Sequence, residues 1–350
     1  MKSPDRGGAH HPLLEMTLSR LREFVREPEA LFWAFGFPIV MSVAMAIAFP
    51  GGDAAPVLVG VEAGAAGDEL RRTLGGVEGI TIRELSPEAQ ERALREGNVH
   101  VLVRGTDPPT YRFDPARDES RLARLVVDNA LKRAAGRSDP WTASEEPVEV
   151  PGSRYVDWLI PGIVGLGIMS TGMWGIGFSI VQARMRKVLK LLMASPMRKR
   201  EYLQAQLFAR LMFLAPEVAV PVGFGVLVLG MPMRGSIGAL VGVSLVGALA
   251  FGAIGLLAAS RVRTFEAISG LMNLLMTPMW ILSGVFFSAS NFPEALQPVI
   301  QALPLTALND ALRLVILEGA TLGEARGELG LLALWGTFAF AVALRLFKWR

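Results

Sequence analysis

The chain has 350 residues, of which 51% are hydrophobic and 19% charged, and its mean hydropathy is +0.40. These proportions exclude a disordered or fibrous protein. They also argue against a soluble enzyme, because the apolar residues gather in runs too long for a globular core. The net charge of +3 does not indicate a nucleic-acid binder, and no cysteine is present for disulfides, thiol catalysis or metal ligation. The sequence predicts a membrane protein.

The first 50 residues predict a surface helix followed by a membrane span. Residues 1–28 are too polar and acidic for a signal peptide, and residues 16–27 predict an amphipathic helix along the cytoplasmic membrane surface. The alternative is a solvated lead-in helix. Residues 30–49 contain no charged side chain and end at Pro50-Gly51-Gly52, so 29–50 form the first predicted transmembrane helix.

Residues 51–156 change abruptly to a soluble composition, with 14 basic and 18 acidic residues. Apolar and turn patterns predict the order βαβαββα, and therefore an inserted, extracytoplasmic α/β domain. A proline- and acid-rich linker is predicted over 139–151. The predicted strands are 57–61, 80–85, 99–103 and 110–113, and the predicted helices are 67–74, 120–135 and one that begins at Ser86-Pro87 and ends at Gly97.

This domain offers no predicted catalytic or metal site. His100 stands alone in a predicted strand, where a structural role is the usual one, and the carboxylates show no metal-ligand spacing. We expect no cofactor and no enzymatic activity of the chain itself.

Five further uncharged or nearly uncharged runs predict membrane spans in residues 157–350. The last is the shortest and reaches both interfaces if Arg345 and Lys348 extend toward water. The glycines of the first of these runs (Gly162, Gly165, Gly167, Gly172, Gly175 and Gly177) predict close helix packing. The predicted fold is an α-helical polytopic membrane protein with six transmembrane helices. The five runs are 158–181, 211–233, 235–260, 267–293 and 329–344.

Basic residues predict the orientation. Residues 182–206 carry seven Lys or Arg against Glu201, whereas residues 288–328 carry two Arg against five acids. Because short cytoplasmic loops are enriched in basic residues, both termini and the 182–206 loop are predicted to be cytoplasmic. We expect a multi-pass protein of the bacterial inner membrane.

The 182–206 loop predicts a docking element. Val188, Leu191 and Leu192 recur at helical spacing among basic residues, and Ser195-Pro196 ends that helix. The alternative is an interfacial helix whose charges only set orientation.

The region 278–319 predicts a second functional element. The fifth span is expected to bend at Pro278 and to reach the outer surface near Phe286. The following residues, 291–317, are apolar but interrupted by Pro293, Pro298 and Pro304. They are too short to span twice, and irregular backbone at membrane depth needs cover from protein or water. We expect a re-entrant pair that dips from the outer face.

These features resemble the membrane subunits of ABC-2-type transporters, the exporter permeases of the ABC superfamily. The resemblance covers nearly the whole chain. It depends on the amphipathic amino-terminal segment, the domain after the first span, the loop LLMASPMRKREYLQAQ (191–206), and the motifs LSGVFF (282–287) and ALPLTALNDALR (302–313). The stretch 183–190, where the family often has glutamates, is basic here.

The resemblance implies a dimer, with an identical or related second permease copy, and a separate ABC ATPase subunit that supplies energy for efflux of a substrate of unknown class. It also implies that the 182–206 loop couples to the ATPase and that the second and fifth spans line the path, with 303–314 as outer gate. The coupling residues would be Arg184, Arg186, Lys187, Lys190, Met193, Pro196 and Arg198. The path or gate residues would be Glu217, Pro278, Gly284, Phe286, Pro304 and Arg313.

Two other function classes stay open. No Gly-x-x-x-x-Gly-Lys-[Ser/Thr] motif occurs, so this chain does not cradle ATP phosphates by a P-loop. Glu217 is the one carboxylate inside the apolar part of a predicted span; it either lines a path or satisfies backbone groups freed by Pro216 and Pro221. An ion-driven secondary transporter that uses Glu217 is therefore one alternative, and a non-transporting membrane anchor for the external domain is the other.

Overall fold

The computed structural model describes residues 32–48, 56–106, 108–138, 141, 144, 154–187 and 199–346, with side chains of 33, 34 and 199–210 excepted. Two compact units are present: an α/β unit within Gly52–Val148, and a helical unit drawn from Met1–Gly51 and Glu149–Arg350. The predicted surface helix 16–27 and most of the 139–151 linker lie outside the described residues.

The α/β unit contains a four-stranded sheet of order β2-β1-β3-β4. Strand β1 pairs in parallel with β2 and β3, and β3 pairs antiparallel with β4. The element order βαβαββα is the predicted one. The strands are β1 (Val57–Glu62), β2 (Ile80–Leu85), β3 (Val101–Arg104) and β4 (Thr110–Phe113), and the helices are α4 (Ala65–Leu74), α5 (Pro87–Arg95) and α6 (Asp118–Ala134).

Strand alternation divides the core of this unit into two faces. Val59 and Val61 of β1, like Val101 and Val103 of β3, are buried in the cluster that includes α4 and α6. Leu102 points the other way and packs in the cluster that includes α5. His100 has the predicted structural role, because its Nδ1 accepts a hydrogen bond of 3.2 Å from the Leu58 amide.

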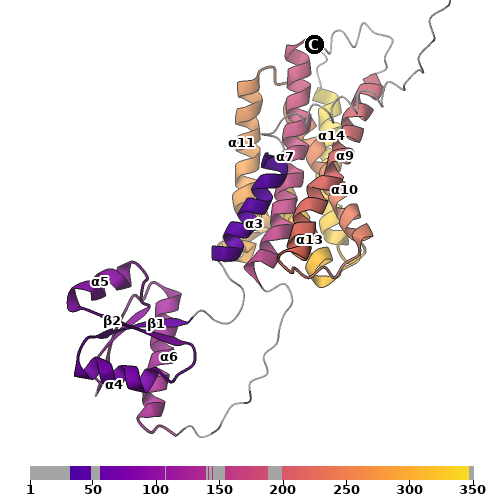
Figure 1. Ribbon diagram of the computed structural model, residues 1–350. Coiled ribbons are helices and arrows are strands. Elements are labelled where there is room, and N and C mark those ends of the chain that lie inside the picture. Colours follow the sequence, from indigo (N-terminus) through magenta and orange to yellow (C-terminus); the bar gives the residue numbers. More distant parts are fainter. Residues whose placement is uncertain are drawn as a thin grey trace, which may run out of the picture. The chain divides into compact units, whose positions relative to one another are not determined.

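The helical unit is built around α7 (Tyr155–Met185), which packs against helices on several sides (Figure 1). Its neighbours include α9 (Lys199–Leu227), α10 (Ile237–Ala259) and α11 (Phe265–Leu282). Helix α14 (Arg326–Leu346) packs on α10. The first predicted span is a π-helical turn, η1 (Phe32–Gly36), followed by α3 (Phe37–Ala48), which also packs on α7.

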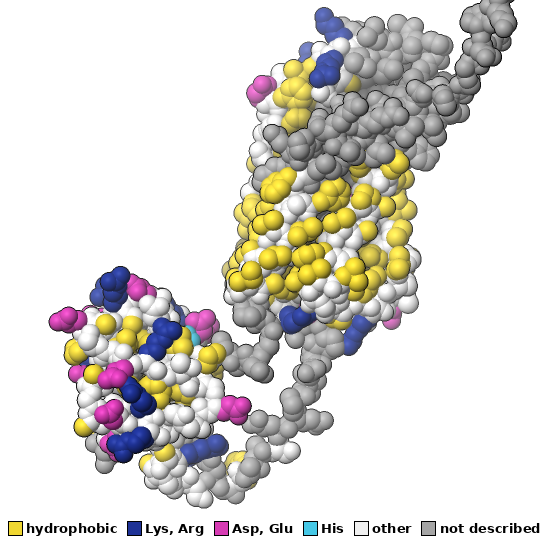
Figure 2. All heavy atoms as spheres, viewed as in Figure 1, with side chains coloured by type: hydrophobic (Ala, Val, Ile, Leu, Met, Phe, Trp, Pro, Cys, Tyr) yellow, Lys and Arg dark blue, Asp and Glu magenta, His cyan; other side chains and the backbone are white. Residues whose placement is uncertain are grey.

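Four helices of the described residues are long and apolar enough to cross a membrane: α7, α10, α11 and α14. A fifth candidate is a bent pair, Glu294–Ala302 with Pro304–Glu318, whose halves meet at 84°. The apolar parts of the first and third predicted spans, Phe37–Ala48 and Leu211–Leu227, are shorter. Hydrophobic side chains cover a broad band of the visible face of this unit (Figure 2). The protein is therefore a multi-pass membrane protein. The described residues contain four or five candidate spans, and the predicted six are not confirmed.

Two helix boundaries differ from the sequence expectation. The charged residues at 184 and 199–201 were assigned to a loop, but α7 continues to Met185 and α9 begins at Lys199. Likewise, the predicted run 267–293 is longer than the helix it marked, because α11 ends at Leu282, with Pro278 inside it. Neighbouring helices and local adjustments satisfy the backbone groups that a proline frees in a membrane helix.

The segment after α11 is made of short helices. Two 3₁₀ turns, η2 (Ala289–Asn291) and η3 (Glu294–Leu296), lead into α12 (Gln297–Ala302), and α13 (Pro304–Arg313) continues as the π-helical η4 (Leu314–Glu318). The chain bends at Leu303, whose backbone is extended, and Pro304 occupies the first turn of α13, where its missing N–H costs nothing. Pro298 likewise lies in the first turn of α12 and does not interrupt it.

Candidate functional site

Arg313 is the centre of a buried polar cluster where α7 begins. Its side chain, 7% exposed, lies with the guanidinium carbon 3.5 Å from the centroid of the Trp158 ring. It donates hydrogen bonds to the carbonyl of Gly284 and, at 3.5 Å, to that of Trp158. Asp310, one turn earlier on α13, forms an ion pair of 3.5 Å with it. A guanidinium can do all of this at once because its planar fork stacks on a ring while its edges donate.

The turn after α11 is the second part of this cluster. Gly284 has φ +68°, a left-handed conformation that favours glycine. The Asn309 amide donates a 3.0 Å hydrogen bond to the Ser283 carbonyl, and the Tyr155 hydroxyl donates a 2.9 Å bond to the Phe286 carbonyl. The turn 283–287 is thereby held to α13 on one side and to α7 on the other.

Glycines of α7 allow this close approach. A Cβ at Gly162 would lie 2.8 Å from the Val285 carbonyl oxygen, and one at Gly165 would lie 2.0 Å from Asn309 Oδ1. The packing role predicted for the glycines of this helix is confirmed at these positions. Gly175 is different, since a Cβ there would meet no atom within 4 Å among the described residues.

Several buried polar atoms of this cluster lack a hydrogen-bond partner within the described parts of the chain. They are Trp158 Nε1, Ser283 Oγ, Asn309 Oδ1 and Arg313 Nε. A buried polar atom without a partner costs about 1–3 kcal/mol.

A second ion pair fixes the start of α7. Arg154 binds both carboxylate oxygens of Asp157, at 2.8 and 3.0 Å, and also donates to the carbonyls of Leu229 and Gly230 at 3.0 and 2.9 Å. The hydrogen bond to Asp157 raises the pKa of Arg154, although burial acts in the opposite direction. Asp157 holds the Arg154 guanidinium in place, and the bonds to the two carbonyls tie α7 to the turn that follows α9.

Glu217 lies in a different part of the helical unit. It is 4% exposed on α9, and its Oε1 is 2.6 Å from the Thr171 hydroxyl of α7. A Cβ at Gly167 would be 3.3 Å from the same oxygen. Gly167 is nine residues beyond Trp158, or about 14 Å along the helix axis, so Glu217 does not belong to the cluster around Arg313.

The structure brings some predicted path and gate residues together and separates others. Gly284, Phe286 and Arg313 meet in the cluster, and the helix that carries Arg313 begins at the buried Pro304. Pro278 is exposed on α11 and makes no part of it. Sequence reasoning missed the residues that join these elements to α7. The only available signals were an aromatic pair and a charged pair at the edge of an apolar run. The missed residues are Arg154, Tyr155, Asp157, Trp158, Thr171 and Asn309.

The opposite end of α7 holds the predicted coupling residues. Arg184 donates to the carbonyls of Ala259, at 3.0 Å, and Ser260, at 3.2 Å, and also to that of Val262. It therefore caps the end of α10 rather than projecting into solvent. Arg186 and Lys187 are exposed, and Lys187 ends the helix with φ +58°. Lys190, Met193, Pro196 and Arg198 lie outside the described residues.

No group of three or more His, Asp or Glu side chains that could hold a metal ion occurs in the described part of the chain. A family model described as "ABC-2 family transporter protein" matches residues 28–345, nearly the whole sequence. No curated protein matches the chain.

Proposed function

We propose that this chain, which belongs to the ABC-2 transporter family, is the membrane subunit of an ATP-driven exporter. Family membership implies that it works with an ABC ATPase subunit, and the match agrees with the absence of a P-loop in the sequence. In our proposal two copies of this chain form the pathway, and ATP binding by two ATPase subunits beneath them drives an unidentified substrate outward.

The observation that carries this proposal is the position of α7, which joins the two predicted functional regions as one helix. Its 31 residues correspond to about 46 Å. At one end Arg184 ties it to the 259–262 turn, next to the loop proposed to contact the ATPase. At the other end Trp158 and Gly162 lie against Arg313 and Val285. A force applied to the loop would therefore displace both ends together.

The cluster around Arg313 would then act as the outer gate. In the resting arrangement Trp158 covers the guanidinium, and Asn309 holds the turn 283–287 against α13. Movement of α7 would withdraw Trp158 and Tyr155 from their partners on the 283–287 turn and α13. Water would replace the broken hydrogen bonds in the open state, which lowers the cost of opening.

Because the chain contains no cysteine, a single introduced thiol can report gate opening. Ser283→Cys places a similar-sized side chain at a fully buried position in the gate, and Ser290→Cys, a few residues further on, is an exposed control. The complex with its ATPase would be labelled with a membrane-impermeant maleimide, with and without a non-hydrolysable ATP analogue. We expect the analogue to increase labelling of Ser283→Cys several-fold and to leave Ser290→Cys unchanged. Equal labelling of Ser283→Cys in both states would refute the gate.

A further inference from the structure

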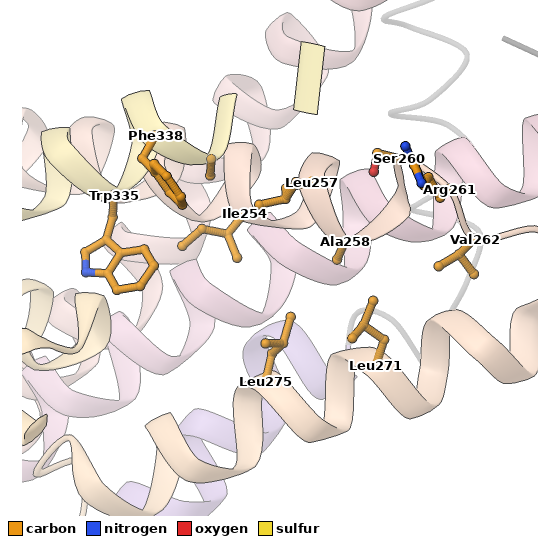
Figure 3. Close-up of a pocket in the computed structure, with 11 residues that line it drawn as sticks. Ile254, Leu257, Ala258, Ser260, Arg261, Val262, Leu271, Leu275, Trp335 and Phe338 are labelled. Atoms are coloured by element: carbon orange, nitrogen blue, oxygen red, sulfur yellow. The ribbon is translucent and has the colours of Figure 1, made fainter. Parts of the chain in front are cut away.

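An apolar groove lies between α10, α11 and α14, away from the gate cluster. Its volume is about 390 Å³, within the range of about 300–1,000 Å³ typical of ligand sites. Leu271 and Leu275 of α11 form one wall, and Ile254 and Ala258 of α10 face them (Figure 3). Trp335, Phe338 and Ala339 of α14 complete the lining.

The groove has an apolar end and a basic end. Trp335 lies at one end and Ser260 with Arg261 at the other (Figure 3). Arg345 is seven residues after Phe338, on the same face of α14. Arg263 follows Arg261 in the same turn, but its charge acts on Arg184 of α7. Arg261 and Arg345 thus lie at the mouth of an apolar groove.

The nearest acidic residue in the sequence does not neutralise this mouth. Glu266 is exposed in the first turn of α11, five residues before Leu271. Five residues correspond to about 140° around a helix, so Glu266 is directed away from the wall that Leu271 and Leu275 form. Among the described residues of α10, α11 and α14, the mouth therefore carries a net positive charge.

The position of the groove along its helices places it within one leaflet of the membrane. Between Ile254 and Arg261 it extends about 10 Å along α10. Trp335 closes the far end of the groove, and its indole donates a 2.9 Å hydrogen bond to the Ala302 carbonyl. Trp335 is nine residues, or about 14 Å along the helix axis, from Arg326 at the start of α14. In a hydrocarbon core of about 30 Å, the groove therefore occupies the leaflet next to the arginines.

We propose that this groove holds an acyl chain of an anionic phospholipid whose headgroup binds Arg261 and Arg345. An apolar groove with a basic mouth at the membrane surface complements both parts of such a lipid, and basic pockets between membrane helices bind anionic headgroups. A lipid phosphate supplies Arg261 and Arg345 with a partner of opposite charge. The inference does not depend on the direction of transport or on the ATPase.

Native mass spectrometry of the delipidated full chain tests this proposal. The protein would be mixed with phosphatidylglycerol or with zwitterionic phosphatidylcholine, and retained lipid would be counted for each variant. Arg261→Gln removes one charge at the mouth; Arg326→Gln, at the other end of α14, is the matched control. Leu275→Trp fills the groove, and Leu274→Trp places the same side chain on the neighbouring, more exposed position.

We expect one tightly retained phosphatidylglycerol and weaker retention of phosphatidylcholine. Arg261→Gln should weaken phosphatidylglycerol binding about fivefold, the effect of one arginine near a charged headgroup, whereas Arg326→Gln should not. Leu275→Trp should abolish retention, and Leu274→Trp should preserve it. Equal retention of the two lipids, or an unchanged lipid count in Leu275→Trp, would overturn the proposal. Loss of a protein dimer without loss of lipid in Leu275→Trp would instead assign the groove to a second copy of the chain.

Discussion

Replacing Gly162 with alanine should weaken the contact between α7 and the turn 283–287. The new Cβ would lie 2.8 Å from the Val285 carbonyl oxygen and 3.2 Å from the Val285 Cα, whereas ordinary contacts begin near 3.4 Å. Both atoms belong to the backbone, and the turn is held by Asn309 and Tyr155. The helix and the turn must therefore separate by about 0.6 Å at the closest pair, and overpacking of this kind costs about 1–3 kcal/mol.

Gly175→Ala provides the matched comparison. It makes the same chemical change inside the same helix, but its Cβ meets no described atom within 4 Å. The gain in helix propensity, about 1 kcal/mol, is common to both variants and cancels in their difference. Unfolding of the full chain in mixed micelles of increasing SDS content, followed by tryptophan fluorescence, would measure that difference. We expect Gly162→Ala to have a free energy of unfolding about 1–3 kcal/mol below that of Gly175→Ala. Equal stability would refute the close packing on which the gate depends.

Three further predictions follow from other parts of the chain. Glu217→Gln should preserve ATP-driven transport, because an amide keeps a hydrogen bond to Thr171; loss of transport in a well-folded variant would favour ion coupling. Arg313→Lys should fold less stably, by about 1–3 kcal/mol in the same SDS titration, because an ammonium loses the fork that both stacks and donates; unchanged stability would contradict this. Burial and Asp128 raise the pKa of Tyr111 to about 12, so the stability that this hydroxyl contributes is complete below pH 10 and is lost as pH rises toward 12. The difference in ultraviolet absorbance between wild type and Tyr111→Phe should show one tyrosine ionising near pH 12. An absorbance difference centred at pH 10 would disprove the raised pKa of Tyr111.

The α/β unit was predictable because its signals are local. Strands β2 and β4 have the predicted bounds, since each is a short apolar alternation between turn residues. Pro87 marked the start of α5, although the Ser86 side chain makes no capping hydrogen bond there. Sequence alone could not give the sheet order. Strand β1 lies between β2 and β3, and residue patterns within a strand do not say which other strands it pairs with.

Membrane helices were found by their uncharged runs, and this explains the boundary errors. An uncharged run marks the part of a helix inside hydrocarbon, whereas the helix itself continues into the headgroup region. Arg184 therefore belongs to α7, where its side chain caps α10. The same reason explains why the run 211–233 missed the first turns of α9, which begins at Lys199.

The cluster around Arg313 was only half predictable. The motifs around Gly284 and Arg313 were recognised as one functional region, but their partners on α7 were not. Trp158 and Tyr155 bind through one ring face and one hydroxyl, and such contacts depend on helix rotation and on the 84° bend at Leu303. Neither quantity follows from residue type or spacing.

The most direct test of the proposed function is native mass spectrometry of the complex purified gently from its own membranes. An ATP-driven exporter predicts an assembly of two copies of this chain with two ATPase subunits, whose mass falls to that of the permease alone when the ATPase gene is deleted. A homo-oligomer of this chain that carries no ATPase, purified from membranes that still transport, would contradict the proposal.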